Sequence, residues 1–140
     1  MIPSVFFDSD VLIDVFARRL PFFDHSQALL TLTEKNMIAG YTSPLVIANV
    51  YYVLQKFGGK DLAKSNIRKI RQILRVIEMN EKTVDLALEL DFSDFEDGLQ
   101  FCAIVQAELN YIITRNLKDY KNSRVAVLSP IEAMSFFKRD

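Results

Sequence analysis

Acidic and amide residues gather at three places in the sequence where their types and spacing suit metal binding. The groups are Asp8 with Ser9 and Asp10, then Asp94 with Glu96 and Asp97, and finally Thr114 with Asn116 and Asp119. Hard divalent cations such as Mg²⁺ take oxygen ligands and retain several waters, so two or three carboxylates from separate segments suffice to hold one. The three groups therefore form a candidate site for Mg²⁺ or a similar ion.

The single histidine and the single cysteine exclude other kinds of metal site. His25 lies beside Asp24 in an amphipathic segment, where a surface position explains it better than ligation does. Cys102 alone can form neither an internal disulfide nor a Cys-x-x-Cys zinc site, and it suits a reducing compartment. The candidate site therefore depends on oxygen ligands.

Residues of the first group also have structural explanations. Asp8 directly follows the apolar run 5–7, where either a helix cap or a metal ligand fits. Ser9 or Asp10 can cap the helix that follows, and Asp10 can instead support the site from behind its ligands. Asp14, one turn further along, is expected to be solvated. Asp8 is therefore the ligand that we expect from this group.

The second group begins a predicted helix. The run 93–96, Ser-Asp-Phe-Glu, is typical of a capping box in which Glu96 is the third residue and has a sufficient structural role. Asp94 and Asp97 are three residues apart and share one helical face. Asp97 precedes the apolar-rich run 98–103, where the helix begins to pack and a carboxylate needs a functional reason. Asp97 is therefore the expected ligand here.

Hydrophobic periodicity and capping residues divide the chain into alternating strands and helices. We expect strands near 5–7, 37–41, 76–78, 111–114 and 125–128. We expect helices near 11–16, 21–36, 43–54, 60–74, 80–90, 93–109 and 129–137, with Gly58-Gly59 separating two of them. This alternation favours a three-layer α/β/α sandwich with a central, mostly parallel five-stranded sheet, as a single domain over residues 1–140.

The predicted sheet explains how distant acids can meet. In open parallel sheets, ligands bind beyond the carboxyl ends of the strands, near the point where the strand order reverses. The group at Asp8 follows the first predicted strand, and the group at Thr114 follows the fourth. The helix that begins at Asp94, Glu96 and Asp97 lies between these two strands in the sequence, so all three groups can converge.

Composition sets the class of protein and its surroundings. The chain has 140 residues, of which 50% are hydrophobic and 25% charged, which favours one folded core over a disordered chain. Its first residues include no basic stretch, and no apolar run approaches the roughly 18–20 residues that span a bilayer. We therefore expect a cytoplasmic protein without membrane association.

Any contact with nucleic acid has to depend on local charge, because the formal net charge is −1. The predicted helix from residue 60 aligns five like charges on one face: Lys60, Lys64, Arg68, Arg71 and Arg75. Such a face is commonly solvated, but it can also follow an RNA backbone. Arg115, beside the third acidic group, can also contact a phosphate.

Four segments together resemble the PIN-domain ribonucleases, in particular the VapC-like toxins of bacterial toxin–antitoxin pairs. The segments are 5–14, the helix from Ser43-Pro44 to Leu54, 94–103 and 113–120. The last two, in this order and about 20 residues apart, make the resemblance fairly specific. It implies Mg²⁺- or Mn²⁺-dependent cleavage of RNA phosphodiester bonds.

The resemblance also assigns roles to individual residues. Asp8 and Asp97 are implied as the core catalytic metal ligands. Asn116 and Asp119 lie where the family's last acidic or amide residue occurs, whereas Ser9, Asp10 and Thr114 occupy supporting positions. Carboxylates clustered in this way hold one or two metals that polarise a phosphoryl oxygen and lower the pKa of an attacking water.

The same resemblance implies protein partners. The chain contains 11 Phe and 5 Tyr, more large apolar groups than a small core readily hides. The family implies a homodimer face and a groove for the amphipathic helix of an antitoxin, and aromatic side chains outside the core suit both.

One position departs from the family pattern. The helix after Ser43 ordinarily carries a Glu ligand, and the matching residue here is Asn49. An amide oxygen can ligate a hard cation, but it is neutral and binds more weakly. Asp94, as a further metal ligand, or Glu96 beside it can supply the missing charge. A PIN-like module that binds RNA or a partner without cutting is therefore an alternative.

A haloacid-dehalogenase-like phosphatase is a less favoured alternative. The run 7–11, Phe-Asp-Ser-Asp-Val, fits the first motif of that family. However, that family needs a strand-end Thr or Ser and a Lys before its second acidic motif, whereas here Thr114 follows Asp94 and Asp97. The order of the motifs therefore argues against this function.

Overall fold

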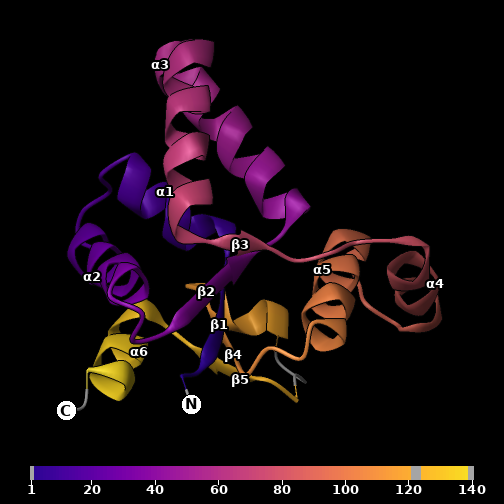
Figure 1. The fold of residues 1–140 in the computed structure, drawn as a ribbon. Helices are drawn as coiled ribbons and strands as arrows, with labels where there is room; N and C mark the ends of the chain where they lie inside the picture. Colours follow the sequence, from indigo (N-terminus) through magenta and orange to yellow (C-terminus); the bar gives the residue numbers. More distant parts are fainter. Residues whose placement is uncertain (1, 121–123, 139–140) are drawn as a thin grey trace.

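A five-stranded sheet lies at the centre of the computed structural model, which describes residues 2–120 and 124–138 (Figure 1). The strands are β1 (Ser4–Phe7), β2 (Ala39–Thr42), β3 (Arg75–Val76), β4 (Tyr111–Ile113) and β5 (Ala126–Leu128). Their order is β3-β2-β1-β4-β5, and every neighbouring pair is parallel. The predicted parallel sheet is therefore confirmed.

Helices cover both faces of this sheet. They are α1 (Ser9–Phe16), α2 (Phe23–Glu34), α3 (Pro44–Ile73), α4 (Glu81–Glu89), α5 (Phe95–Gln106) and α6 (Pro130–Phe137), with a short 3-10 helix, η1 (Leu117–Tyr120). In Figure 1, α1, α2 and α6 lie on one side of the strands, and α4 and α5 lie on the other. The predicted three-layer sandwich is confirmed.

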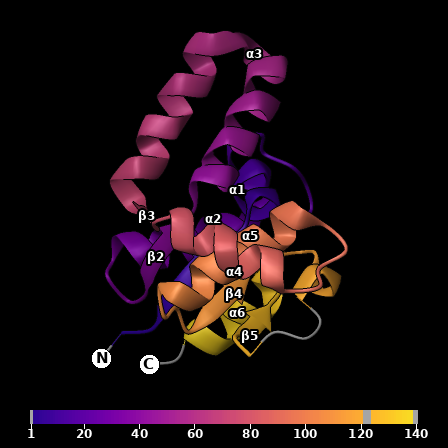
Figure 2. The ribbon, with the colours of Figure 1, turned by 90° about the vertical axis from the view of Figure 1, so that its right-hand side faces the viewer.

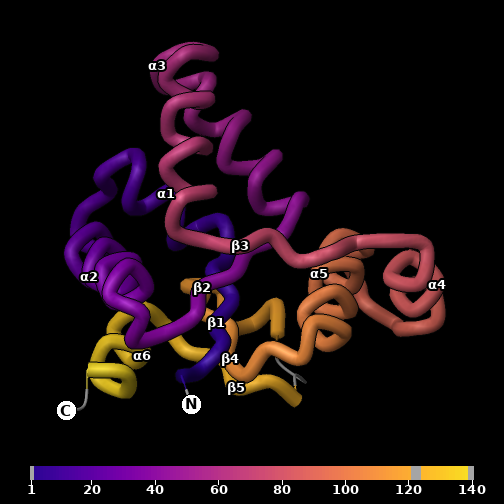
Figure 3. Tube along the Cα trace, viewed as in Figure 1, coloured from indigo at the N-terminus to yellow at the C-terminus, as the bar shows by residue number. Residues whose placement is uncertain are grey.

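The central strand β1 is the point at which the strand order reverses. The chain first adds β2 and β3 on one side of β1, and it then crosses through α4 and α5 before β4 pairs with the other side (Figure 3). Val5, Phe6 and Phe7 of β1 are completely buried, as are Ile112 and Ile113 of β4. The apolar strands thus form the core, and the polar residues that follow them meet at one edge of the sheet.

Helix α3 consists of two arms joined at a sharp bend. Its backbone leaves the helical conformation at Gly58 and Gly59, and Gly59 has a φ of +88°. We call residues 44–57 the first arm and residues 60–73 the second arm. Figure 2 shows the two arms side by side, standing above the rest of the protein. The predicted separation of two helices by the glycine pair is confirmed.

Several predicted boundaries were wrong by a few residues. Helix α2 begins at Phe23 rather than at Pro21. Strand β3 contains only Arg75 and Val76, because α3 ends at Ile73 and the chain extends at once. Arg75 is therefore not on the helical face where its spacing placed it.

None of the helices in residues 2–120 and 124–138 combines the length and the apolar character that a membrane-spanning helix needs.

Replacing Gly59 by alanine tests the bend. A side chain at this φ is strained although nothing lies within 4 Å of the added carbon. We expect Gly59→Ala to reduce the free energy of unfolding by about 1–3 kcal/mol in urea denaturation. Gly58→Ala is the control, because its φ of −148° is open to other residues and only the flexible Leu62 side chain has to move. Equal losses in both variants would contradict this explanation.

Candidate active site

A polar cleft of about 370 Å³ opens beyond the carboxyl ends of β1 and β4. It brings together residues from α1 and the turn before it, the first arm of α3, α5 and η1. The polar lining residues are Asp8, Ser9, Asp10, Asn49, Glu96, Asp97, Gln100, Asn116, Asp119 and Tyr120. All three acidic groups noted in the sequence thus contribute to one cleft.

Asp8 is the most firmly held side chain of the cleft. It is 8% exposed, and its Oδ1 accepts hydrogen bonds from the Ser9 backbone N–H (2.8 Å) and from Gln100 Nε2 (3.2 Å). Its Oδ2 accepts from Thr114 Oγ1 (2.9 Å) and from the Tyr120 hydroxyl (3.4 Å). These donors offset the cost of burying a carboxylate and fix its orientation.

Gln100 and Tyr120 are site residues that the sequence analysis missed. Ser43 Oγ donates to Gln100 Oε1 (2.8 Å), which turns the Gln100 amide group so that its Nε2 also reaches the Tyr120 hydroxyl (2.9 Å). Burial and the nearby Asp8 carboxylate raise the pKa of the Tyr120 phenol, so it remains a protonated donor. One signal was available: Gln100 is a polar residue in an apolar run, three positions after Asp97.

Asp10 lines the cleft, and its carboxylate is also bonded to the residues that follow β4. Its Oδ2 accepts from the Arg115 backbone N–H (3.0 Å) and from Thr114 Oγ1 (3.3 Å). Burial and the negative charge of Asp8 raise its pKa to about 6, whereas the Arg115 hydrogen bond and charge act in the opposite direction. These contacts suit the supporting role expected for Asp10.

Electrostatic repulsion concentrates at Asp97. Partial burial is the largest cause of its raised pKa of about 6, and the charges of Asp119, Asp94, Asp8 and Glu96 add to it. Burial, Asp8 and Asp94 likewise raise the pKa of Asp119. A divalent cation between these oxygens would relieve the repulsion, so the donor set fits Mg²⁺ or Mn²⁺. Among the residues that the structure describes, no group of three or more Asp, Glu, His or Cys side chains is placed so that it could hold a metal ion.

Asn49 faces the cleft from the first arm of α3. Its Nδ2 donates to Ser9 Oγ (2.9 Å), and Ser9 begins α1 immediately after Asp8. The residue contributes a neutral amide to the cleft, at the position for which the resemblance implies a Glu. Its contact with Ser9 links the first arm of α3 to the turn that carries Asp8.

Asp94 caps α5, so the predicted capping box at Ser93 was wrong. Asp94 Oδ1 accepts from the Asp97 backbone N–H (3.1 Å), and the Asp94 backbone is extended as a cap requires. Ser93 and Asp94 are adjacent, and either residue type can cap a helix. The helix begins after Asp94, one residue later than a capping box at Ser93 requires. Glu96 consequently lines the cleft, whereas Asp94 is not among the lining residues.

Arg115 forms an ion pair with the buried Asp14, which corrects the expectation for Asp14. Asp14 is completely buried rather than solvated, and its carboxylate accepts from Arg115 Nε (2.6 Å) and Nη2 (3.1 Å). The Arg115 guanidinium also lies 3.9 Å from the centre of the Phe22 ring. Arg115 therefore fixes the loop after β4 to α1, and its positive charge is paired with the Asp14 carboxylate.

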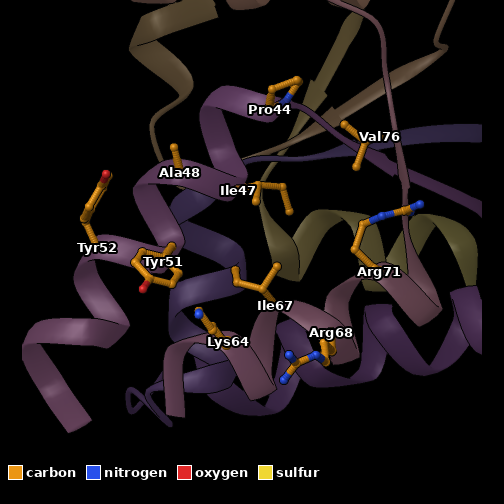
Figure 4. Close-up of a pocket in the computed structure, with 10 residues that line it drawn as sticks. All are labelled: Pro44, Ile47, Ala48, Tyr51, Tyr52, Lys64, Ile67, Arg68, Arg71 and Val76. Atoms are coloured by element: carbon orange, nitrogen blue, oxygen red, sulfur yellow. The ribbon is translucent and has the colours of Figure 1, made fainter. Parts of the chain in front are cut away.

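The basic residues predicted for RNA separate in the structure. Lys64, Arg68 and Arg71 line a second cavity, between the arms of α3. Lys60 follows the bend and is not among the lining residues, and Arg75 borders a different cavity beyond β3. Of the predicted basic face, only Lys64, Arg68 and Arg71 thus line one cavity (Figure 4).

Comparison with known proteins identifies the family. A profile described as the PIN domain matches residues 4–118. The chain belongs to the PIN domain family. It is 32% identical over 134 residues to Ribonuclease VapC1 of Aquifex aeolicus, with 92% of each chain covered. The suspected resemblance is confirmed, and the haloacid-dehalogenase alternative is wrong.

Solved structures agree with this fold. A VapBC2 complex from Rickettsia felis bound to a DNA fragment from its promoter has a TM-score of 0.70 and 16% identity, covering 90% of this chain and 98% of that chain. A toxin–antitoxin complex from Klebsiella pneumoniae has a TM-score of 0.69 and 18% identity, with 91% and 98% covered. At these identities the likeness shows the PIN fold.

Removing Arg115 tests its role in this PIN domain. Arg115→Ala leaves the buried Asp14 carboxylate without its partner, so we expect a loss of about 3 kcal/mol in the free energy of unfolding, measured in urea. Lys118→Ala, an exposed cation nearby, is the control. Unchanged stability combined with weaker RNA binding would show instead that Arg115 acts on a ligand.

Proposed function

We propose that this PIN domain is a metal-dependent ribonuclease and the toxin of a toxin–antitoxin pair. The observation that carries the proposal is the convergence of Asp8, Asp97 and Asp119 at one cleft. These acids come from three segments separated by long stretches of chain, and their oxygens repel one another. The relative at 32% identity is a ribonuclease, which supports RNA as the substrate.

Divalent-ion chemistry suits the lining of the cleft. Asp8, Asp97 and Asp119 would hold Mg²⁺ or Mn²⁺, with Asn116 as a neutral oxygen ligand. When bound, such an ion would polarise a phosphoryl oxygen and lower the pKa of an attacking water. Gln100 and Tyr120 keep Asp8 in a fixed orientation through their hydrogen bonds.

The Asn49 position sets the charge of the proposed site. The chain lacks the carboxylate that the family pattern has here, so fewer negative charges face the ion. Glu96 lines the cleft and offers a replacement charge, whereas Asp94 acts on Asp97 from its capping position. We propose a site that binds its ion more weakly than one with Glu at position 49.

Protein partners form part of the same proposal. Two of the similar solved structures contain toxin–antitoxin complexes, which supports an antitoxin as a partner. Large apolar side chains are exposed on several elements, including Phe57, Leu88 and Ile131. We propose that an antitoxin and a second copy of the chain cover some of these surfaces.

Asp97→Asn tests the proposed reaction. This change removes a ligand charge with little change in volume, and Asn retains the backbone N–H that bonds Asp94. We expect RNA cleavage in Mg²⁺ or Mn²⁺ to fall at least about a hundredfold while the melting temperature without metal is retained. We also expect Mn²⁺ to raise the melting temperature of the wild type but not of the variant.

Asp24→Asn is the matched control, because Asp24 is exposed on α2 and does not line the cleft. Full cleavage by Asp97→Asn would overturn the assignment of Asp97. RNA binding by a wild-type protein that cuts no RNA in either metal would instead favour the module that binds without cutting.

Asn49→Glu tests the charge of the site. An added carboxylate attracts a divalent ion more strongly than an amide does, so we expect about a tenfold lower metal concentration for half-maximal cleavage. Titration of Mg²⁺ and Mn²⁺ on one RNA measures the effect. Gln55→Glu adds the same charge on the same arm outside the cleft lining and serves as the control. Coincident curves for Asn49→Glu and the wild type would place position 49 outside the metal site.

A further inference from the structure

Hydrogen-bond donors of the protein occupy all the acceptor sites of the Asp8 carboxylate. An ionised carboxylate offers about four such sites, two on each oxygen. Asp8 Oδ1 accepts from the Ser9 backbone N–H and from Gln100 Nε2. Asp8 Oδ2 accepts from Thr114 Oγ1 and from the Tyr120 hydroxyl. An ion that binds Asp8 directly therefore has to take the place of one of these donors.

Tyr120 is the donor that an ion replaces most easily. Its hydroxyl lies 3.4 Å from Asp8 Oδ2, the longest of the four distances, whereas hydroxyl donors usually lie about 2.7 Å from their acceptors. Tyr120 also lines the cleft. Thr114, the other donor to the same oxygen, is completely buried and is not among the lining residues. The Ser9 N–H belongs to the backbone at the start of α1, so it cannot turn away from the carboxylate alone.

Gln100 is held in place from several sides. Its Oε1 accepts from the buried Ser43 hydroxyl (2.8 Å), and its Nε2 donates both to Asp8 and to the Tyr120 oxygen (2.9 Å). Rotation of the Gln100 amide group would break all three contacts. A hydroxyl proton, in contrast, rotates about the C–O bond while its oxygen stays where it is. Gln100 can therefore keep the Tyr120 oxygen in position while the Tyr120 proton turns away from Asp8.

We propose that the Tyr120 hydroxyl occupies the position on Asp8 Oδ2 that a divalent ion takes, so that Tyr120 is a positioning residue that lowers the affinity of the cleft for its ion. This inference rests on the metal site of the proposed function, and it adds a residue that regulates that site. A contact made only before the ion binds opposes binding by its own strength, whereas a contact that persists does not. The Tyr120 contact is of the first kind, and the Thr114 contact is of the second.

Ion affinity in the absence of RNA provides the first test. Tyr120→Phe removes the hydroxyl and keeps the ring, and electron paramagnetic resonance of free Mn²⁺ measures the Kd. We expect the Kd to fall about three- to tenfold, because the ion no longer has to replace a hydrogen bond to a charged oxygen. Thr114→Val is the matched comparison, since it removes the other donor to Asp8 Oδ2 with little change in volume. We expect no tighter binding by Thr114→Val.

Thermal melting gives a second, independent measure of the same contact. Without added ion, Tyr120→Phe should have a lower melting temperature than the wild type, because the buried Asp8 carboxylate has lost a donor. In saturating Mn²⁺ this difference should disappear, since the wild type has then lost the same hydrogen bond. Thr114→Val should remain less stable than the wild type in both conditions.

Tyrosine absorption reports the displacement directly. The chain has 5 Tyr and no Trp, so its near-ultraviolet band reflects the tyrosines. We expect Mg²⁺ to shift this band in the wild type, because the Tyr120 hydroxyl loses its carboxylate acceptor, and we expect no shift in Tyr120→Phe. Tyr41→Phe is the control, because Tyr41 lines a different cavity. It should keep both the shift and the wild-type affinity for Mn²⁺.

The outcomes distinguish this inference from the proposed metal site. If Mn²⁺ binds the wild type and Asp97→Asn weakens this binding, but Tyr120→Phe has the wild-type Kd, the metal site stands and the inference about Tyr120 is wrong. If Mn²⁺ binds neither the wild type nor Tyr120→Phe, the metal site fails and the inference fails with it. Equally tighter binding by Thr114→Val and Tyr120→Phe would also overturn the inference. Absence of the Mg²⁺-induced shift in the wild type would overturn it without any variant of Tyr120.

Discussion

Burial of the Asp8 carboxylate is the constraint on which the architecture of the site depends. A carboxylate removed from water costs several kcal/mol unless donors replace its hydration, so each donor has to be held in place. The donors come from the start of α1, from α5, from the residue after β4 and from η1. The hydrogen bonds that stabilise the buried Asp8 carboxylate therefore also join the elements around the cleft. Ser43 extends this network to the start of α3 through Gln100.

The remaining acids are arranged differently from Asp8. Burial and neighbouring negative charges raise the pKa values of Asp97 and Asp119. Asp119 is among the charges that act on Asp97, and Asp8 acts on both. The cleft alone would therefore repel the phosphates of RNA, whereas a divalent ion held there would offset part of its negative charge. The first arm of α3 separates this cleft from the cavity between the arms, which Lys64, Arg68 and Arg71 line, and Tyr52 borders both. The bend at Gly59 brings the two arms together, so a backbone feature far from the acids shapes the neighbouring surface.

Sequence reasoning succeeded where the physical cause is local. Ser43, Asn80 and Ser129 cap helices as their sequence context predicts, and Gly58-Gly59 interrupts α3 because neither residue follows the helical conformation. The capping residue of α5 was misassigned because Ser93 and Asp94 are both good caps and only packing selects between them. Asp14 was expected in solvent because its partner, Arg115, is 101 residues away in the chain. The catalytic and metal-binding roles of the individual acids stay predictions.

The sequence by itself determined the alternation of strands and helices, the bend in α3 and the acids that follow β1 and begin α5. Each of these depends on periodicity, capping or backbone freedom within a few neighbouring residues. Only the tertiary structure decided that Gln100 and Tyr120 hold Asp8, and that two tyrosines share a groove with Lys64 and Arg68. These contacts join residues far apart in the chain, and their geometry follows from how the helices pack on the sheet, which no local pattern encodes.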